Sequence, residues 1–152
     1  MTGSLTGCGA GQLAQTSEQQ SAVSGASGDV GPGIALRDVK FPYPADPTGR
    51  YPVRSAVAVL AVIINHGSHA DELVAVTSPY ADPAQMVGTT QIPPDRNLVC
   101  GPDPAQPASP LIVGSVRVVL VTNTVLRAGL DTPVTFRFRQ AGEVTLLVPM
   151  AA

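Results

Sequence analysis

Short apolar runs separated by polar turns dominate the chain from residue 34 onward. In residues 134–138, valine and phenylalanine alternate with threonine and arginine, which predicts a strand with one buried and one solvated face. Ala141 and Gly142 follow as a turn, and residues 144–148 return as the next strand. The end of the chain is therefore predicted to be a β-hairpin.

A nearly continuous apolar run occupies residues 55–65. Its β-branched content and the turn that follows favour a central strand over a helix. Residues 65–69, with the sequence Asn-His-Gly-Ser-His, predict a tight connection. Residues 71–78 are then expected to return as the partner strand of a hairpin.

Other segments carry weaker strand patterns, and no stretch shows helical periodicity. Prolines interrupt residues 41–47 and 79–110, because proline cannot donate a hydrogen bond to a strand ladder. We expect the remaining short strands at residues 34–39, 86–87, 98–99 and 116–122. About seven short strands separated by turns predict an all-β sandwich.

Composition agrees with one β-rich domain. A chain of 152 residues is long enough for a single self-sufficient core with little left beyond a tail or linker. Its net charge is only −2, so there is no basic field to attract nucleic acid. No apolar run approaches the roughly 20 residues needed to cross a bilayer as a helix. Any attachment to a membrane is therefore expected to use something other than a transmembrane helix.

The start of the chain contains a candidate site for lipid attachment. Leu5-Thr6-Gly7-Cys8 has the form of a bacterial lipobox, in which Cys8 receives a diacylglyceryl group and becomes the first residue after cleavage. Two fatty acyl chains, such as palmitate, suffice for stable anchoring. The alternative is an ordinary cysteine in a tail. A signal peptide needs a charged and then an apolar region, for which Met1 lies too close to Cys8, so the start codon is internal or the chain was trimmed.

These features divide the chain into three parts. Residues 1–7 are the expected remnant of a lipoprotein signal peptide. Residues 8–33 are rich in Gly, Ser, Ala, Gln and Thr, and are expected to be a flexible linker. Residues 34–150 are the expected β-sandwich domain.

Two groups of residues carry a resemblance to a known family. Ser-Pro-Tyr-Ala at 78–81 follows the strand pattern of 71–77, and Phe-Arg-Phe-Arg-Gln-Ala-Gly-Glu-Val occupies 136–144. In this order they resemble the PCuAC-type periplasmic copper chaperones. The resemblance covers about 115 residues, from residue 34 to residue 150, and implies a Greek-key, cupredoxin-like β-sandwich.

Within that group the chain is similar to the actinobacterial LpqE-like lipoproteins. The similarity lies in Gly-Cys-Gly-Ala-Gly-Gln at residues 7–12 and Leu-Arg-Asp-Val at residues 36–39. It implies an extracytoplasmic lipoprotein held on the periplasmic face of the cell membrane. It also implies a protein partner, the respiratory (cytochrome bc–oxidase) supercomplex near its cytochrome oxidase.

Copper chaperones of the resembled family hold Cu(I) with thioether sulfur and imidazole, two of them in a His-x-Met pair on a strand. The alignment places Arg117 and Val119 at those two positions. The resembled family has a second His-x-Met cluster, which aligns near residues 84–86, and of its ligands only Met86 is present here. The simpler interpretation of Met86 is that it packs near the core. The resemblance therefore implies a domain that has lost its copper ligands, and no cofactor is expected.

The other chemically capable side chains are few. His66 and His69 flank a turn, where exposure is the common outcome and two imidazoles make half a metal site at most. Asp71 and Glu72 are adjacent on a strand, so they point to opposite faces and cannot act as a carboxylate pair. Cys100 is the only thiol besides Cys8, and is expected either to be buried or to bond another molecule.

No residue order typical of a hydrolase or of a phosphate-binding loop is present, so an enzyme is not expected. The sequence predicts a non-catalytic accessory lipoprotein that binds a protein partner at the membrane surface. The alternative is a periplasmic copper chaperone with a rearranged Cu(I) site built from Met86, His66, His69 or Cys100.

Overall fold

The computed structural model describes residues 25–101 and 110–151, and all regular elements in these ranges are strands. None of the described residues forms a helix that is long and apolar enough to span a membrane. The first sheet has the order β1-β2-β5-β9-β10-β4, and β7 also pairs with β10. Its strands are β1 (Ala26–Val30), β2 (Ile34–Lys40), β4 (Ala56–Ala58), β5 (Leu60–Asn65), β7 (Gln85–Gly88), β9 (Arg96–Cys100) and β10 (Ile112–Val121).

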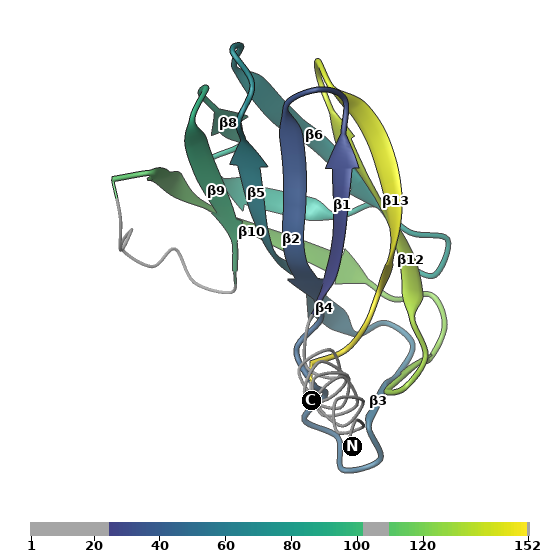
Figure 1. Ribbon diagram of the computed structural model, residues 1–152. Helices are drawn as coiled ribbons and strands as arrows, with labels where there is room; N and C mark the ends of the chain where they lie inside the picture. The colour runs from purple at the N-terminus through teal and green to yellow at the C-terminus, as the bar shows by residue number, and fades with distance from the viewer. Residues whose placement is uncertain (1–24, 102–109, 152) are drawn as a thin grey trace, which may run out of the picture.

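The second sheet has the order β13-β12-β6-β8, and a two-stranded ribbon joins β11 to β3. The strands are β6 (Asp71–Thr77), β8 (Gln91–Ile92), β12 (Thr132–Phe138), β13 (Gly142–Val148), β3 (Arg50–Tyr51) and β11 (Leu126–Arg127). Figure 1 shows the two layers facing each other. The predicted all-β sandwich is confirmed, as is the hairpin of β12 and β13.

The core lies between the two sheets. Leu36, Ile63 and Val118 enter it from the first sheet, and Phe136 and Val148 enter it from the second, and all five are fully buried. Phe136 lies on the alternating face that the sequence predicts to be apolar. Removing these side chains from water is the main stabilising contribution available to a domain without disulfides in its described part.

The apolar run predicted as one central strand is divided in two. Val59 separates β4 from β5, and its backbone N–H donates to Val118 O at 2.9 Å. β5 pairs with β2 and β9, whereas β4 pairs with β10. β9 ends at Cys100, which lies opposite Ala61, so it does not extend alongside the residues before Ala61. Those residues, which form β4, pair with β10 instead.

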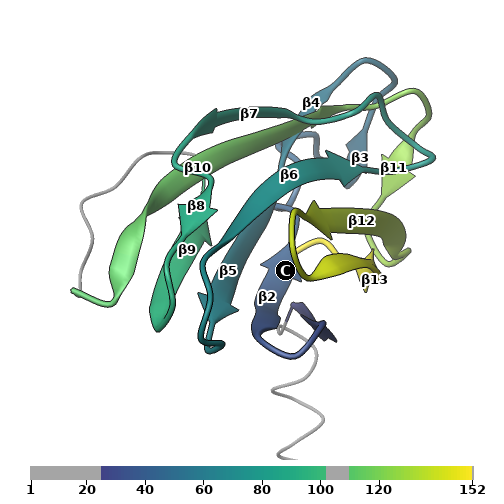
Figure 2. The ribbon, with the colours of Figure 1, turned by 90° about the horizontal axis from the view of Figure 1, so that it is seen from above.

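The predicted hairpin between this strand and β6 is wrong. β6 pairs with β12 and β8, so the connection after β5 crosses from one sheet to the other. Figure 2 shows β6 leaving the layer of β5 to run beside β12. The side chain of Asn65 supports the crossing: its Nδ2 donates to His69 O at 2.8 Å and to Ile92 O at 2.9 Å, and its Oδ1 accepts from Gly67 N at 3.0 Å. A strand that pairs in a hairpin and a strand that crosses to the opposite sheet show the same alternation of apolar residues. The sequence pattern therefore could not distinguish the two connections.

The predicted C-terminal boundary of the linker, residue 33, is wrong, because the folded domain begins earlier in the chain. Residues 26–30 form β1, which pairs with β2 and contacts β13, and Val30 is buried. Gly28 permits the close approach, because a Cβ there would lie 2.5 Å from Leu146 Cδ2. A Gly- and Ser-rich segment has little strand propensity of its own, so pairing with β2 decides its structure. Residues 1–24, including Cys8, lie outside the described residues.

The strands run between two ends of the sandwich, here called the tip and the base. The tip carries the turns at residues 31–33, 66–70, 93–95 and 139–141, and His66 N donates to Gly33 O there at 2.8 Å. The base carries the loops at residues 41–55, 78–84 and 122–131, of which the first lies at the bottom of Figure 1 and the other two on its right side. Gly25 also belongs to the base, since its N–H donates to Asp38 Oδ1 at 3.0 Å where β2 ends.

Candidate functional site

The two segments that the copper-chaperone resemblance singles out are neighbouring strands. β7 pairs with β10 in antiparallel register, with Gln85 opposite Val119, Met86 opposite Val118 and Val87 opposite Arg117. Residues that are thirty or more positions apart in the chain therefore share one stretch of sheet. This region is the natural place to test for a metal site.

Alternation divides these residues between two faces. Directly opposed residues of an antiparallel pair project to the same side of the sheet. Val118 is fully buried, so Met86 faces the core with it and packs against the core cluster. Arg117 is exposed, and Val87 beside it is 70% exposed. The interpretation of Met86 as a core side chain is confirmed.

The outer face of β7 and β10 does not fit Cu(I). Arg117 is always protonated and offers no free lone pair, and Val87 and Val119 have no donor atom. Gln85 contributes only an amide, which is a hard ligand, whereas Cu(I) prefers thioether, thiolate and imidazole. The thioether of Met86 lies on the opposite face. This face therefore presents no set of donors suited to Cu(I).

The two histidines lie at the tip, where both are exposed as expected. A hollow of about 720 Å³ is also found there, and its lining includes His69, Asp71 and Gln140. His69 Nδ1 lies 3.1 Å from Ser68 Oγ. Nowhere in residues 25–101 and 110–151 do three or more His, Cys, Asp or Glu side chains group in a way that suits a metal ion.

Cys100 lies at the end of β9 with its thiol buried in the core. Burial raises the pKa of this thiol to about 12, because a thiolate loses its hydration there. The sequence left burial and intermolecular bonding open, and the structure places the residue inside. Such a thiol is inert toward soft metals and oxidants at neutral pH.

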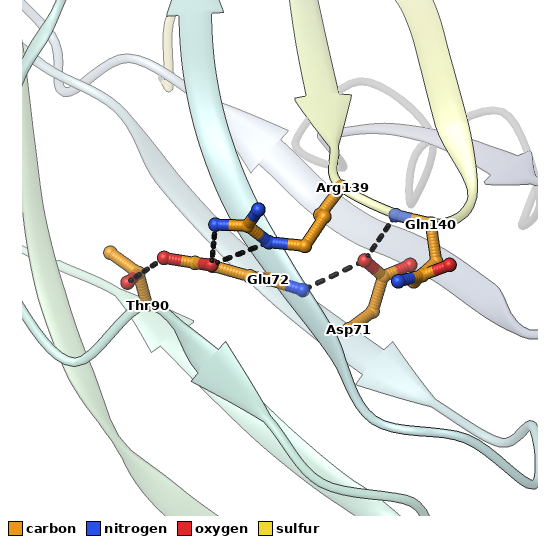
Figure 3. A network of polar contacts seen from close by, with 5 residues as sticks. All are labelled: Asp71, Glu72, Thr90, Arg139 and Gln140. Carbon is orange, nitrogen blue, oxygen red and sulfur yellow. Dashed lines mark hydrogen bonds and ion pairs between the residues drawn. The ribbon is translucent and has the colours of Figure 1, made fainter.

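The tip contains a polar network that the sequence analysis did not find. Asp71, at the start of β6, is buried, and its carboxylate accepts from Glu72 N and from Gln140 N, each at 2.8 Å (Figure 3). It also accepts from Ala141 N at 2.9 Å. It therefore fastens the β12–β13 turn to β6. This role of Asp71 could not be predicted from the residues around it, because Gln140 and Ala141 lie about seventy positions further along the chain.

Glu72 points to the other face, as adjacent strand residues must. Its Oε1 accepts from Arg139 Nε at 3.0 Å and Nη2 at 2.7 Å, and Oε2 lies 3.4 Å from Thr90 Oγ1 (Figure 3). The two carboxylates thus make separate structural contacts, as their adjacent positions on one strand predict. Together they fix the geometry of the tip.

Comparisons with known proteins agree with the fold and the resemblance. Two PCuAC domains of known structure superpose on the chain with a TM-score of 0.62: an apo domain from PmoF1, 23% identical, and a copper-bound domain from PmoF2, 20% identical. The match covers 83% of this chain in both cases, and 99% and 97% of those domains. The fold is therefore that of a cupredoxin-like PCuAC domain.

The sequence comparisons give a narrower result. The family described as "Putative lipoprotein LpqE-like" matches residues 34–150, and the chain belongs to this family. A protein of Mycobacterium leprae named "Putative lipoprotein LpqE" is 33% identical over all of this chain and 84% of its own length. Its namesake in Mycobacterium tuberculosis is 27% identical over the same shares.

Proposed function

We propose that this protein is a non-catalytic lipoprotein, anchored on the extracytoplasmic face of the cell membrane, whose PCuAC-like domain binds a protein partner and does not carry copper. The observation that supports it is the outer face of β7 and β10. There the chain presents Arg117 and Val119 in place of the His-x-Met pair of the resembled chaperones, and Met86 faces away from both.

The anchor in this proposal is Cys8. Its support is the Leu5-Thr6-Gly7-Cys8 motif together with membership of a family described as lipoproteins. Sixteen residues, 9–24, lie between Cys8 and Gly25, the first described residue. The proposed linker spans this interval, and the folded domain begins at its end.

The proposed partner is the respiratory supercomplex, near its cytochrome oxidase, as the family resemblance implies. A cupredoxin-like domain without copper donors on its exposed sheet is suited to binding, since its outer face offers apolar and cationic side chains. A non-catalytic role agrees with the PCuAC fold, whose copper-chaperone members act by carrying a metal.

Co-purification tests the proposal. A C-terminally tagged protein, expressed from its full gene, is isolated from membranes solubilised in mild detergent. We expect subunits of the cytochrome oxidase supercomplex to co-elute with wild-type protein, and Cys8→Ser to reduce their yield strongly, because the anchor raises the local concentration of the partners. Isolation of the anchored protein without any supercomplex subunit would contradict the proposed partner.

The alternative is a chaperone with a rearranged Cu(I) site from Met86, His66, His69 or Cys100. These four side chains are distributed over the core side of β7, the tip and the buried end of β9. Competition with a chromophoric Cu(I) chelator separates the two functions. Removal of copper from a tight chelator by the wild-type protein would favour the chaperone.

A further inference from the structure

The exposed apolar side chains of the described residues are concentrated at the base. Of nine large hydrophobic residues that are exposed, five lie in the base loops: Tyr43, Val53, Tyr80, Val125 and Leu130. Tyr80, Val125 and Leu130 also line a hollow of about 420 Å³. A cluster of this kind on a soluble domain normally marks a contact surface.

Hydrogen bonds hold the base loops together as one surface. Asn123 N donates to Tyr80 O, and Arg54 N donates to Thr122 O, each at 2.9 Å. The β3–β11 ribbon links the first and third loops, and Ala128 N donates to Gly49 O at 2.9 Å. The five apolar side chains are therefore presented by a fixed scaffold.

The base carries no net charge. The charged side chains of its three loops are three arginines and three aspartates: Arg50, Arg54, Arg127, Asp46, Asp82 and Asp131. At the end of β2, Asp38 and Lys40 form a further ion pair with N and O 3.0 Å apart, which adds no net charge. Arg54 and Asp82 form an exposed ion pair with N and O 3.7 Å apart. A strongly charged partner would find no surface of opposite net charge here. A bilayer with neutral head groups and an apolar interior matches the base better.

The chain enters the domain at this same end. A flexible linker such as the one proposed, running the seventeen positions from Cys8 to Gly25, would have a root-mean-square span of about 21–25 Å. The tip lies farther away by at least the length of β12, which is roughly 23 Å for seven strand residues. An anchor at Cys8 therefore favours contact between the base and the bilayer, because contact through the tip would require the linker to extend along the whole length of the domain.

We propose that the base rests on the lipid surface, with Tyr43 and Leu130 at the level of the head groups and the tip directed away from the membrane. Tyrosine suits this position because its ring is apolar and its hydroxyl remains hydrated. The inference rests on the proposed anchoring at Cys8. It orients the domain so that the outer face of β7 and β10 stays open to the side, where a membrane protein can reach it.

The test couples the full chain to vesicles without relying on cellular lipidation. The Cys8 thiol is joined to a maleimide lipid in phosphatidylcholine vesicles; Cys100 does not compete, because its thiol is buried and its pKa is about 12. The sequence has no tryptophan, so a single introduced one reports its own environment. Leu130→Trp probes the base, and Leu111→Trp is the matched control near the tip, since these residues are 63% and 52% exposed.

We expect the emission of Leu130→Trp to shift to the blue on coupling and to lose most of its intensity in vesicles of brominated lipid. Leu111→Trp should keep its solution spectrum. Adding Tyr43→Ser and Val53→Ser to Leu130→Trp should abolish most of the quenching, and anionic lipid or salt should change little because the base is neutral.

An unquenched Leu130→Trp on coupled protein would overturn the inference, and so would equal quenching of Leu111→Trp. A blue shift that appears only on adding solubilised membrane proteins would assign the base to a protein partner instead, and also overturn it. Failure of Cys8 lipidation in cells would refute the proposed anchor separately, because the coupled protein still reports which end meets lipid.

Discussion

Met86 lies directly opposite Val118 between β7 and β10, and both side chains face the core. This register, more than the missing histidine, explains why one remaining thioether does not leave half a copper site. The positions that share the outer face with Arg117 and Val119 are Val87 and Gln85.

The first prediction concerns Cu(I). We expect wild-type protein to leave the spectrum of a chromophoric Cu(I)–chelator complex unchanged. Arg117→His with Val119→Met restores a nitrogen and a sulfur donor, and Val87→Met adds a second sulfur directly opposite, so the triple variant should compete best. Met86→Ala in the triple variant is the control and should not weaken competition. Loss of binding in that control would show that the sulfur of Met86 reaches the outer face.

The second prediction concerns the anchor. Protein expressed from its full gene should incorporate an alkyne fatty-acid analogue and partition into the detergent phase of Triton X-114. Cys8→Ser should abolish both, since no other residue of the lipobox bears a thiol, while Cys100→Ala should leave both unchanged. In-frame codons upstream of Met1 should encode a basic and then an apolar stretch. Labelling that survives Cys8→Ser would rule out this anchor.

The third prediction concerns the start of the folded domain. Deleting residues 1–24 should barely change the free energy of unfolding in urea. Deleting residues 1–30 removes β1, exposes the edge of β2 and loses the buried side chain of Val30, which alone is worth about 2 kcal/mol. Equal midpoints for the two truncated proteins would show that β1 contributes nothing to stability.

The fourth prediction concerns the tip. Asp71→Ala leaves three backbone N–H groups without their acceptor in a partly buried site, and should cost about 3 kcal/mol or more. Asp71→Asn keeps one acceptor oxygen and should cost less. Arg139→Ala removes an exposed ion pair from the same network and should cost less than about 1 kcal/mol. Urea unfolding of the three variants measures the order, and a reversed order would refute the assignment.

The fifth prediction concerns pH. The pKa of the Cys100 thiol is raised by burial from 9.0 to about 12, so its contribution to stability is complete below pH 9 and is lost as pH rises toward 12. In that range the unfolded chain releases a proton that the folded chain keeps, which lowers stability by at most about 1.4 kcal/mol per pH unit. Unfolding of the Cys8→Ser protein, compared with and without Cys100→Ala, should isolate this slope. Identical pH dependence would contradict it.

Several features were predictable because they depend on neighbours in the sequence. The alternation in residues 134–138 predicted which face Phe136 buries, and Ala141-Gly142 predicted the hairpin turn. The opposite orientation of Asp71 and Glu72 follows from strand geometry alone. Loss of the His-x-Met pair could also be inferred from the residues once the resemblance fixed their alignment.

Other features depend on partners far along the chain. The sequence by itself determined an all-β domain, its terminal hairpin and the absence of copper donors at Arg117 and Val119, since these are properties of local pattern and residue type. Only the tertiary structure decided that β6 leaves the sheet of β5, that residues 26–30 form a strand, and that Asp71 holds a turn. In each case the energy comes from pairing or hydrogen bonds between segments whose proximity no local pattern encodes.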